Sequence, residues 1–266
     1  MVEPIRVVVH GILGRMGQEV TRALCSDPEL EVVGAVEREV GEDHLLLPQG
    51  DTGVPFSSDV EYILDCCKPE VLVDFTVAEA TRSVVPVAAR HRVNLVIGTT
   101  GLTASDISDI DRLAKVNGVG VVIAPNFALG AVIMTHLAEV AAKFFDWAEI
   151  IEMHHEQKLD APSGTALATA KAMLHSRGKP FFNSGEQKEM LSGARGGQME
   201  GIAIHSVRLP GLLAHQQVIL GAAGQTLTIR HDAISRECYI PGVLLAIKKV
   251  IKLNGLVYGL DALLGL

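Results

Sequence analysis

The sequence predicts an α/β protein in which a doubly wound parallel sheet is joined to a second, α+β domain with a mixed or antiparallel sheet. Three observations lead to this prediction. Short β-branched runs alternate with helix-like segments through the first half of the chain, as in strands joined by crossover helices. A glycine-rich turn follows the first of these runs. In the second half, strand-like runs follow one another directly, which is typical of a mixed or antiparallel sheet.

The composition limits the class of protein. A chain of 266 residues suits one large or two modest domains, and a hydrophobic fraction of 48% is ample for a packed core. Because the net charge is -8 and no long basic run occurs, binding to nucleic acid or to an anionic membrane is not expected. The chain also has no run of about 18 uncharged apolar residues, so no membrane span is expected.

The four cysteines, Cys25, Cys66, Cys67 and Cys238, form no C-x-x-C pair. Adjacent cysteines rarely make a useful structural disulfide, so we expect reduced thiols in a cytoplasmic protein. The first residues have neither the basic region nor the long apolar region of a secretory signal, which favours the same compartment.

In the first half, buried strands are expected where apolar residues run without interruption, over residues 5–10, 31–36, 71–75, 93–97 and 119–124. Helices are expected between them, over residues 16–24, 78–90 and 103–116. Residues 40–58 are rich in Gly, Asp and Pro and are interpreted as a loop.

The second half begins with a helix over residues 129–145, a strand over 148–153 and an Ala-rich helix over 163–175. A polar loop is expected over residues 179–197. Strands are then expected over residues 201–207, 215–221 and 226–231. The tail from residue 241 is apolar and is interpreted as helical.

The glycine turn of residues 11–17 lies between an expected strand and an expected helix. Helix N-terminal N–H groups attract a pyrophosphate, and glycines allow the backbone to approach it closely. The spacing of Gly11, Gly14 and Gly17 departs from the commonest fingerprint, because Leu13 stands where its middle glycine would be. Such turns also occur without a ligand, but an acid at the end of the second strand favours dinucleotide binding.

That acid is Glu37, whose carboxylate can accept hydrogen bonds from a ribose diol. The adjacent Arg38 can pair instead with a 2′-phosphate, so the choice between NADH and NADPH stays open. Two solvated charges at a strand end are the alternative. Two later strands end at residues 98–100 and 124–127. In an open parallel sheet these strand ends line the ligand crevice. The alternative interpretation is that both segments are ordinary loops.

The densest polar stretch, residues 152–165, ends an expected strand and begins an expected helix. Ser163 suits the helix cap, and the N–H groups of Gly164 and Thr165 would then form an anion site for a carboxylate. His154 and His155 can exchange a proton near neutral pH, and Lys158 can bind an anion or donate a proton.

Two other interpretations of this stretch compete with acid–base chemistry. Zinc binding is one, although the residues do not follow H-E-x-x-H and adjacent histidines diverge on a strand, so no metal is expected. An ordinary solvated loop is the other.

The chain resembles the dihydrodipicolinate reductase family, also called 4-hydroxy-tetrahydrodipicolinate reductases, of the diaminopimelate route to lysine. The resemblance covers nearly the whole length and is carried chiefly by E-x-H-H-x-x-K-x-D-A-P-S-G-T-A at residues 152–166. Further motifs occur in the family's order: G-x-x-G-R-M-G at 11–17, V-D-F-T at 73–76, G-T-T-G at 98–101, P-N-F at 125–127 and H-x-A-x-S-R at 231–236.

The resemblance implies a Rossmann-like dinucleotide-binding domain over residues 1–126 and 235–266. Residues 127–234 would form a central α+β domain with an open mixed sheet that binds a small dicarboxylate substrate and assembles a homotetramer. Catalytic roles fall to His154 and Lys158, and substrate contacts to His155, Lys158, Ser163, Gly164 and Thr165. The residues expected to bind NADH or NADPH are Gly11, Ile12, Leu13, Gly14, Arg15, Met16, Glu37, Arg38, Gly98, Thr99, Thr100, Ala124, Pro125, Asn126 and Phe127.

The chain departs from the family pattern away from the acid–base signature. Ala128 stands where a Ser is common, Ile12 is bulkier than usual, and the Gly and Glu often found before His215 are replaced by Leu213 and Ala214. Two rival functions remain: a related dehydrogenase acting on another amino-dicarboxylate, and a non-catalytic nucleotide sensor. A sensor would be expected to have lost the His or the Lys, and this chain retains both.

Overall fold

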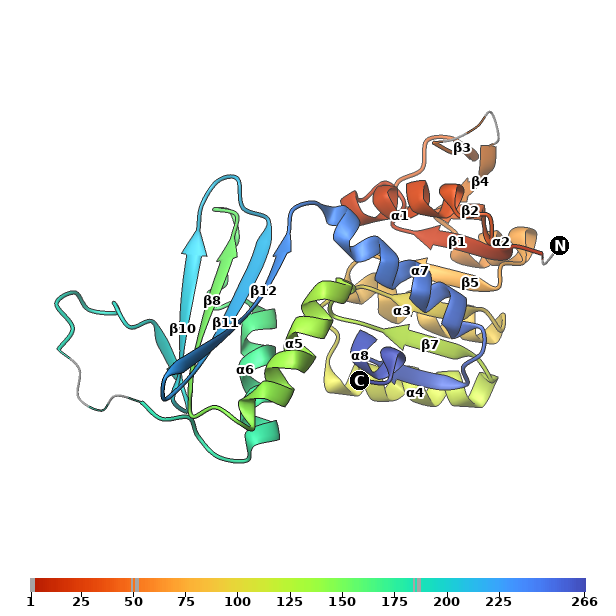
Figure 1. The fold of residues 1–266 in the computed structure, drawn as a ribbon. Helices are drawn as coiled ribbons and strands as arrows, with labels where there is room; N and C mark the ends of the chain where they lie inside the picture. Colours follow the sequence, from red (N-terminus) through yellow and green to blue (C-terminus); the bar gives the residue numbers. More distant parts are fainter. Residues whose placement is uncertain (1–2, 49, 51–52, 184, 186–187) are drawn as a thin grey trace. The chain divides into compact units, whose positions relative to one another are not determined.

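The computed structural model describes residues 3–48, 50, 53–183, 185 and 188–266. The chain divides into two compact units, one made of Met1–Leu129 with Tyr239–Leu266 and the other of Gly130–Cys238 (Figure 1). The first unit is therefore built from both ends of the chain. The boundaries lie a few residues later than the expected ones at 126 and 234.

The first unit is built on an eight-stranded sheet in the order β13-β7-β6-β5-β1-β2-β4-β3. Its strands are β1 (Ile5–His10), β2 (Leu30–Val36), β3 (His44–Leu46), β4 (Gly53–Ser57), β5 (Val71–Asp74), β6 (Asn94–Ile97), β7 (Gly120–Ile123) and β13 (Gly255–Tyr258). All neighbours are parallel except β3, which pairs antiparallel with β4 at the edge. The chain builds outward from β1 in both directions, so the strand order reverses between β1 and β5.

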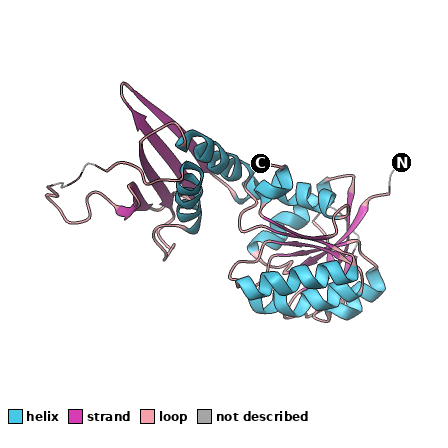
Figure 2. Cartoon of the chain, turned by 90° about the horizontal axis from the view of Figure 1, so that it is seen from below, coloured by secondary structure: helices cyan, strands magenta, loops and turns pink. Residues whose placement is uncertain are grey.

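Helices lie on both faces of this sheet (Figure 2). They are α1 (Arg15–Ser26), α2 (Val60–Cys67), α3 (Ala78–Arg90), α4 (Ala104–Asn117), α7 (Ile240–Val250) and α8 (Leu260–Leu264), with a 3-10 turn over Arg236–Tyr239. Because helices cover both faces, most residues of the central strands are buried, and Val7, Val8 and Val9 of β1 have no exposed surface. The predicted Rossmann-like, doubly wound fold is confirmed.

Two predictions in this unit were wrong. The loop expected over residues 40–58 contains β3 and β4, which are too short and too interrupted by Gly and Pro to produce a strand pattern. The tail is not helical throughout, because β13 adds to β7 as a parallel edge strand. Residues 49 and 51–52 of the first expected loop, and 184 and 186–187 of the loop expected over 179–197, lie outside the described residues.

The second unit has a five-stranded mixed sheet in the order β12-β11-β8-β10-β9. Its elements are α5 (Leu129–Ala142), β8 (Trp147–His154), α6 (Gly164–Arg177), β9 (Gly197–Met199), β10 (Ile202–Arg208), β11 (Ala214–Ala222) and β12 (Gln225–Ala233). The central strand β8 is parallel to β10 and antiparallel to β11, as the predicted mixed sheet requires.

A single apolar core holds α5 and α6 against this sheet. Ala138 of α5 and Met173 of α6 pack in one buried cluster with Ile150 of β8 and Val218 of β11. Because β8 is the central strand and packs under both helices, it anchors the start of the predicted acid–base stretch to this core.

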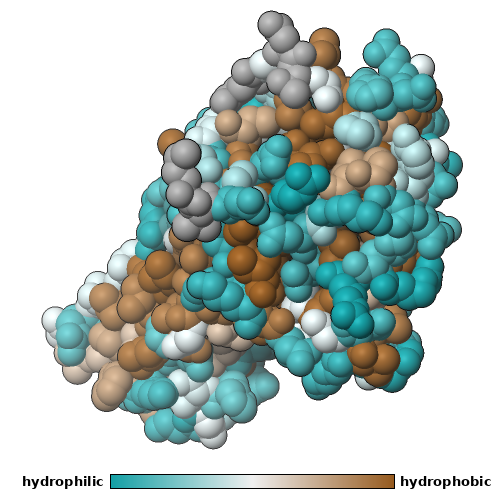
Figure 3. Space-filling view, turned by 90° about the vertical axis from the view of Figure 1, so that its right-hand side faces the viewer, coloured by the Kyte–Doolittle hydropathy of each residue, from teal (hydrophilic) through white to brown (hydrophobic). Residues whose placement is uncertain are grey.

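No helix in the described part of the chain is long and apolar enough to cross a bilayer. The face seen in Figure 3 mixes hydrophilic residues with hydrophobic ones. Scattered apolar residues are normal on a folded protein's surface and define no site by themselves.

Candidate active site

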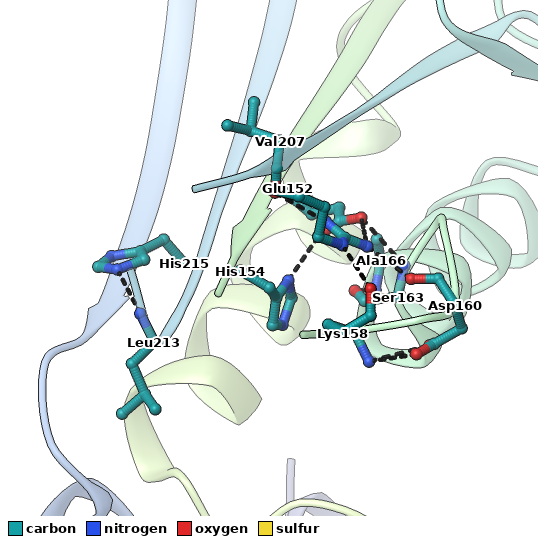
Figure 4. Close-up of polar contacts among 10 residues, drawn as sticks. Glu152, His154, Lys158, Asp160, Ser163, Ala166, Val207, Leu213 and His215 are labelled. Atoms are coloured by element: carbon teal, nitrogen blue, oxygen red, sulfur yellow. Dashed lines mark hydrogen bonds and ion pairs between the residues drawn. The ribbon is translucent and has the colours of Figure 1, made fainter. Parts of the chain in front are cut away.

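A buried carboxylate, Glu152, organises the end of β8. Its side chain has no exposed surface, and its Oε2 atom lies 2.5 Å from Nδ1 of His154, two residues further along the strand (Figure 4). The backbone N–H of Ser163 donates to the other oxygen, Oε1, at 3.3 Å. Glu152 therefore joins the strand that carries the histidine to the start of α6.

Arg208, the last residue of β10, neutralises this carboxylate. Its Nη1 and Nη2 donate to Oε2 and Oε1 of Glu152 at 2.9 and 2.8 Å, a two-pronged pairing that is stronger than a single contact. Nη2 also donates to the carbonyl oxygen of Asp160 at 2.6 Å. Parallel pairing of β10 with β8 sets Arg208 directly opposite His154.

The charges in this cluster determine which ring nitrogen of His154 carries a hydrogen, and they shift its pKa. Burial alone would raise the pKa of Glu152, but hydrogen bonds from Arg208 and His154 bring it below its ordinary value, so Glu152 is ionised. An ionised carboxylate only accepts, so Nδ1 of His154 carries the shared hydrogen and Nε2 remains for a substrate. Burial lowers the pKa of His154, and the hydrogen bond to Glu152 raises it. The effect of burial is larger, so the pKa lies below the ordinary value for histidine.

Lys158 lies on the loop after β8 and is paired with Asp160. Its Nζ donates to both carboxylate oxygens at 2.7 and 2.9 Å. This hydrogen bond lowers the pKa of Asp160, whose side chain is 61% exposed. Exposed ion pairs are weak, so a substrate carboxylate can replace Asp160 on Lys158.

The helix start expected at Ser163 is present. The Ser163 hydroxyl accepts from the backbone N–H of Ala166 at 3.2 Å and caps α6. N–H groups in the first turn of a helix have no intrahelical partner. Apart from its chain neighbours and the backbone of α6, no atom of the described residues lies within 4 Å of a Cβ built on Gly164. The positive end of α6 is thus open beside Gly164, which suits a carboxylate.

The remaining predicted residue of this stretch, His155, is half-buried, and no described residue forms a hydrogen bond or ion pair with its ring. His215 of β11 lies apart from Lys158 in Figure 4 and is oriented by Asp232, whose Oδ1 is 2.7 Å from its Nδ1. The structure therefore gathers His154, Lys158 and Ser163 around Glu152 and Arg208.

In the first unit, the glycine turn follows β1 at the point where the strand order reverses, the usual place for a nucleotide in such sheets. Gly11 has a φ of 82°, and a Cβ on Gly17 would lie 2.1 Å from the Gly11 carbonyl oxygen. The N-cap of α1 is Gly14, with no side-chain cap and no acidic residue in the first turn. A helix N-terminus with free N–H groups, next to glycines that leave room for a ligand, suits the binding of a pyrophosphate.

Glu37 faces this turn from the end of β2. Its Oε2 accepts from the backbone N–H of Leu13 at 3.1 Å, and its Oε1 accepts from the N–H of Arg38 at 3.0 Å. Arg38 itself is exposed. This arrangement places a carboxylate beside the turn and an unburied cation next to it, which fits a ribose or a 2′-phosphate.

A buried network that the sequence did not reveal supports the turn. Asp74, at the end of β5, is fully buried and accepts from the Thr76 hydroxyl at 2.6 Å. The N–H of Thr76 donates to the hydroxyl of Thr99 at 3.2 Å, and the Thr76 methyl lies 2.8 Å from where a Gly11 Cβ would be. His10 Nδ1 lies 3.2 Å from Asp74 Oδ1. The ends of β1, β5 and β6 are thereby locked together.

The other predicted cofactor residues follow β6 and β7. A Cβ on Gly98 would lie 2.1 Å from the Phe75 ring. That ring packs against Phe127 in a tilted arrangement, with 5.8 Å between the ring centroids. Ala124 and Phe127 are buried. Asn126 accepts from the N–H of Ala128 at 2.9 Å and shapes this loop.

Two further features bear on alternative sites. No group of three or more His, Cys, Asp and Glu side chains suited to a metal ion occurs among the described residues. A cavity of about 490 Å³ opens in the second unit beside Trp147, Glu149 and Phe182, and none of the predicted site residues lines it.

Family models cover almost the whole chain. Residues 5–127 match the family described as "Dihydrodipicolinate reductase, N-terminus", and residues 130–264 match "Dihydrodipicolinate reductase, C-terminus". The chain is 58% identical over 263 residues to a 4-hydroxy-tetrahydrodipicolinate reductase of Dehalococcoides mccartyi, covering 99% of both chains. It is 51% identical over 266 residues to the enzyme of that name from Moorella thermoacetica, with 99% of each covered.

Solved structures give the same result. A dipicolinate-bound dihydrodipicolinate reductase from Paenisporosarcina sp. TG-14 superposes with a TM-score of 0.88 at 41% identity, covering 97% of this chain and 98% of that one. An amine dehydrogenase from Mycobacterium smegmatis has a TM-score of 0.65 at 17% identity, which shows a shared fold alone.

Proposed function

Because the chain belongs to the dihydrodipicolinate reductase family, we propose that it is a 4-hydroxy-tetrahydrodipicolinate reductase, an NAD(P)H-dependent oxidoreductase of the diaminopimelate route to lysine. The observation that carries the proposal is the cluster at the end of β8, where an ionised Glu152 fixes the His154 ring beside Lys158 and the α6 start. The reaction converts the substrate, NAD(P)H and one proton to tetrahydrodipicolinate, NAD(P)⁺ and water.

The substrate's two carboxylates need two anchors of different kinds. The ammonium of Lys158 is a mobile point charge, now held by the exposed Asp160. The N–H groups of Gly164 and Thr165 at the start of α6 form a fixed anion site. We assign one carboxylate to each, with His155 and the Ser163 cap beside them.

The chemistry needs a hydride at one carbon of a conjugated cyclic imine and a proton at the other end of the system. NAD(P)H supplies the hydride when bound. We assign the proton to Nε2 of His154, because Nδ1 is held by Glu152. A histidine with a lowered pKa is a stronger acid and gives up its proton readily.

The cofactor is assigned to the first unit. The N–H groups of the glycine turn and α1 would hold the pyrophosphate, and Glu37 would accept from the ribose hydroxyls. Arg38 would pair with the 2′-phosphate of NADPH, so both cofactors are expected to serve. We also assign cofactor contacts to the loops at residues 98–100 and 124–127.

We further propose that the enzyme is a cytoplasmic homotetramer assembled through the second unit. The four cysteines, Cys25, Cys66, Cys67 and Cys238, are free, which supports a reducing compartment. The outer strand β12 is largely exposed in the single chain, and Leu227 on it is 38% exposed, which supports its use as a subunit contact.

An assay with freshly made substrate tests the proposed reaction. We expect the purified full-length chain to oxidise both NADH and NADPH only when the substrate is present, monitored by loss of nicotinamide absorbance. Turnover of another amino-dicarboxylate instead would identify a related dehydrogenase. Tight NADH binding without turnover of any substrate would identify a nucleotide sensor and contradict the proposal.

A further inference from the structure

Two adjacent thiols lie at the end of α2, remote in sequence from every residue assigned above. The Sγ atoms of Cys66 and Cys67 are 3.4 Å apart, both cysteines are free, and neither belongs to the proposed reaction. Cys66 is exposed, whereas Cys67 is 4% exposed. One thiol is therefore open to reagents, and the second lies directly beneath it.

The backbone around this dithiol is fixed. Nη2 of Arg6 donates to the Cys67 carbonyl oxygen at 2.5 Å, and Lys68 ends the helix in the left-handed conformation with its N–H bonded to Leu64. A Cβ built on Gly34 of β2 would lie 2.8 Å from Cys67 Sγ, so the absence of a side chain at Gly34 makes room for this sulfur. The close approach of the two thiols is thus imposed by the packing of α2.

A disulfide between these cysteines is disfavoured by elementary geometry. Consecutive Cα atoms are about 3.8 Å apart across a trans peptide, whereas disulfides usually span about 4.4–6.8 Å between Cα atoms. Closing the bond would require the end of α2 to rearrange, against the contacts of Arg6 and Lys68. A ligand atom that bridges two sulfurs without joining them does not require that rearrangement.

The surroundings also disfavour a divalent metal. Zinc takes deprotonated thiols and a nearly complete set of four ligands. Burial raises the pKa of the Cys67 thiol to about 12, and no third His, Cys, Asp or Glu completes a metal site within the described chain. Among the described residues the site offers two adjacent thiols and no third metal-binding side chain, so a fitting ligand reacts with thiols and has two positions to exchange.

We propose that Cys66 and Cys67 form a vicinal-dithiol site that captures a monosubstituted trivalent arsenical as a cyclic dithioarsinite. The arsonous acid R–As(OH)₂ loses both hydroxyl groups, and each leaves as water with the hydrogen of one thiol. Two As–O and two S–H bonds break, and two As–S bonds and two water O–H bonds form. Arsenic remains trivalent, so no oxidant or reductant is required.

Phenylarsine oxide is the probe for this site. The reduced full-length protein is treated with it, washed with excess 2-mercaptoethanol and analysed by intact mass. Monothiols strip an arsenical held by one sulfur, so only a chelated adduct should remain. We expect one adduct per chain, with the mass of the reagent less one water, and its complete release by 2,3-dimercaptopropanol.

Variants locate the adduct. Cys66→Ser changes an exposed side chain and should fold normally yet lose the retained adduct, as should Cys67→Ala. A Cys25→Ser/Cys238→Ser double variant keeps the dithiol and should retain the full adduct. Retention by Cys66→Ser, or loss only in the double variant, would overturn the proposal. So would absence of a retained adduct in the unmodified protein, or stoichiometric zinc bound in a Cys66-dependent way.

Discussion

His154 Nδ1 lies 2.5 Å from an oxygen of Glu152, a carboxylate with no exposed surface. Because Arg208 also holds this carboxylate with two hydrogen bonds, Glu152 stays ionised and acts as a fixed acceptor for the ring. The pairing sets the ring's tautomer and orientation, and it stabilises the imidazolium form from which a proton would be given. Glu152 is thus a positioning residue for His154, the proposed proton donor.

Replacing Glu152 by Gln should change the pH dependence as well as the rate. If His154 donates from its protonated form, kcat/KM falls as pH rises through a pKa below the ordinary His value of about 6.5. Glu152 raises that pKa, so Glu152→Gln should move the falling limb to lower pH. It should also lower kcat by roughly 10²–10⁴-fold, measured across a pH series.

Glu149→Gln is the matched control. Glu149 lies on the same strand and also pairs with an arginine and a histidine, Arg195 and His205, but away from the proposed site. It should leave the falling limb unmoved. An equal displacement in both variants would mean that the effect reflects general loss of negative charge from the unit.

Lys158→Ala should lower kcat and raise KM. In the proposed role the ammonium binds a substrate carboxylate in the ground state and the transition state alike, so its loss should affect binding as well as rate. One charge-assisted contact is worth about 1.5–3 kcal/mol, which corresponds to a KM increase of roughly 10- to 150-fold. Steady-state kinetics measure the change, and Lys171→Ala, an exposed lysine of α6, should have no effect. An unchanged KM would remove Lys158 from substrate binding.

Arg38→Ala should weaken NADPH selectively. Arg38 is exposed beside Glu37, so a 2′-phosphate would give its guanidinium a specific partner. Calorimetry should show a loss of about 1.5–3 kcal/mol for NADPH and almost none for NADH. Equal weakening of both cofactors would show that Arg38 supports the loop rather than the phosphate.

Prolonged treatment with a chelator should leave activity unchanged. Nδ1 of His154 is occupied by Glu152, and no group of three metal-binding side chains occurs among the described residues. Elemental analysis should find no stoichiometric zinc. Reversible loss of activity that added zinc restores would revive the metal interpretation.

The central strands and the start of α6 were predictable from short stretches of sequence. Uninterrupted apolar runs marked β1 and β5–β7, and Ser163 marked the start of α6, because these signals act within a few residues. The short strands β3 and β4 and the returning edge strand β13 left weaker signals. These strands form because the backbone groups of a neighbouring strand pair with them. A pattern of nearby residues contains no information about such a neighbour.

The support around the site was not predictable for the same reason. Arg208 reaches Glu152 from 56 residues away because β10 pairs in parallel with β8, and nothing near Arg208 in the chain indicates this register. The network of Asp74, Thr76 and His10 beneath the glycine turn likewise depends on β1 and β5 being neighbours. Sequence motifs identified the groups proposed to contact ligands, and the sheet order supplied the groups that hold them.

The most direct test of the account is the kinetics of His154→Ala with freshly made 4-hydroxy-tetrahydrodipicolinate. Loss of a general acid should lower kcat by roughly 10²–10⁴-fold, with a smaller change in KM, because the donor engages chiefly in the transition state. NADH affinity should stay near normal, since the proposed cofactor residues lie in the other unit. A normal kcat with a raised KM would make His154 a binding residue and contradict the mechanism.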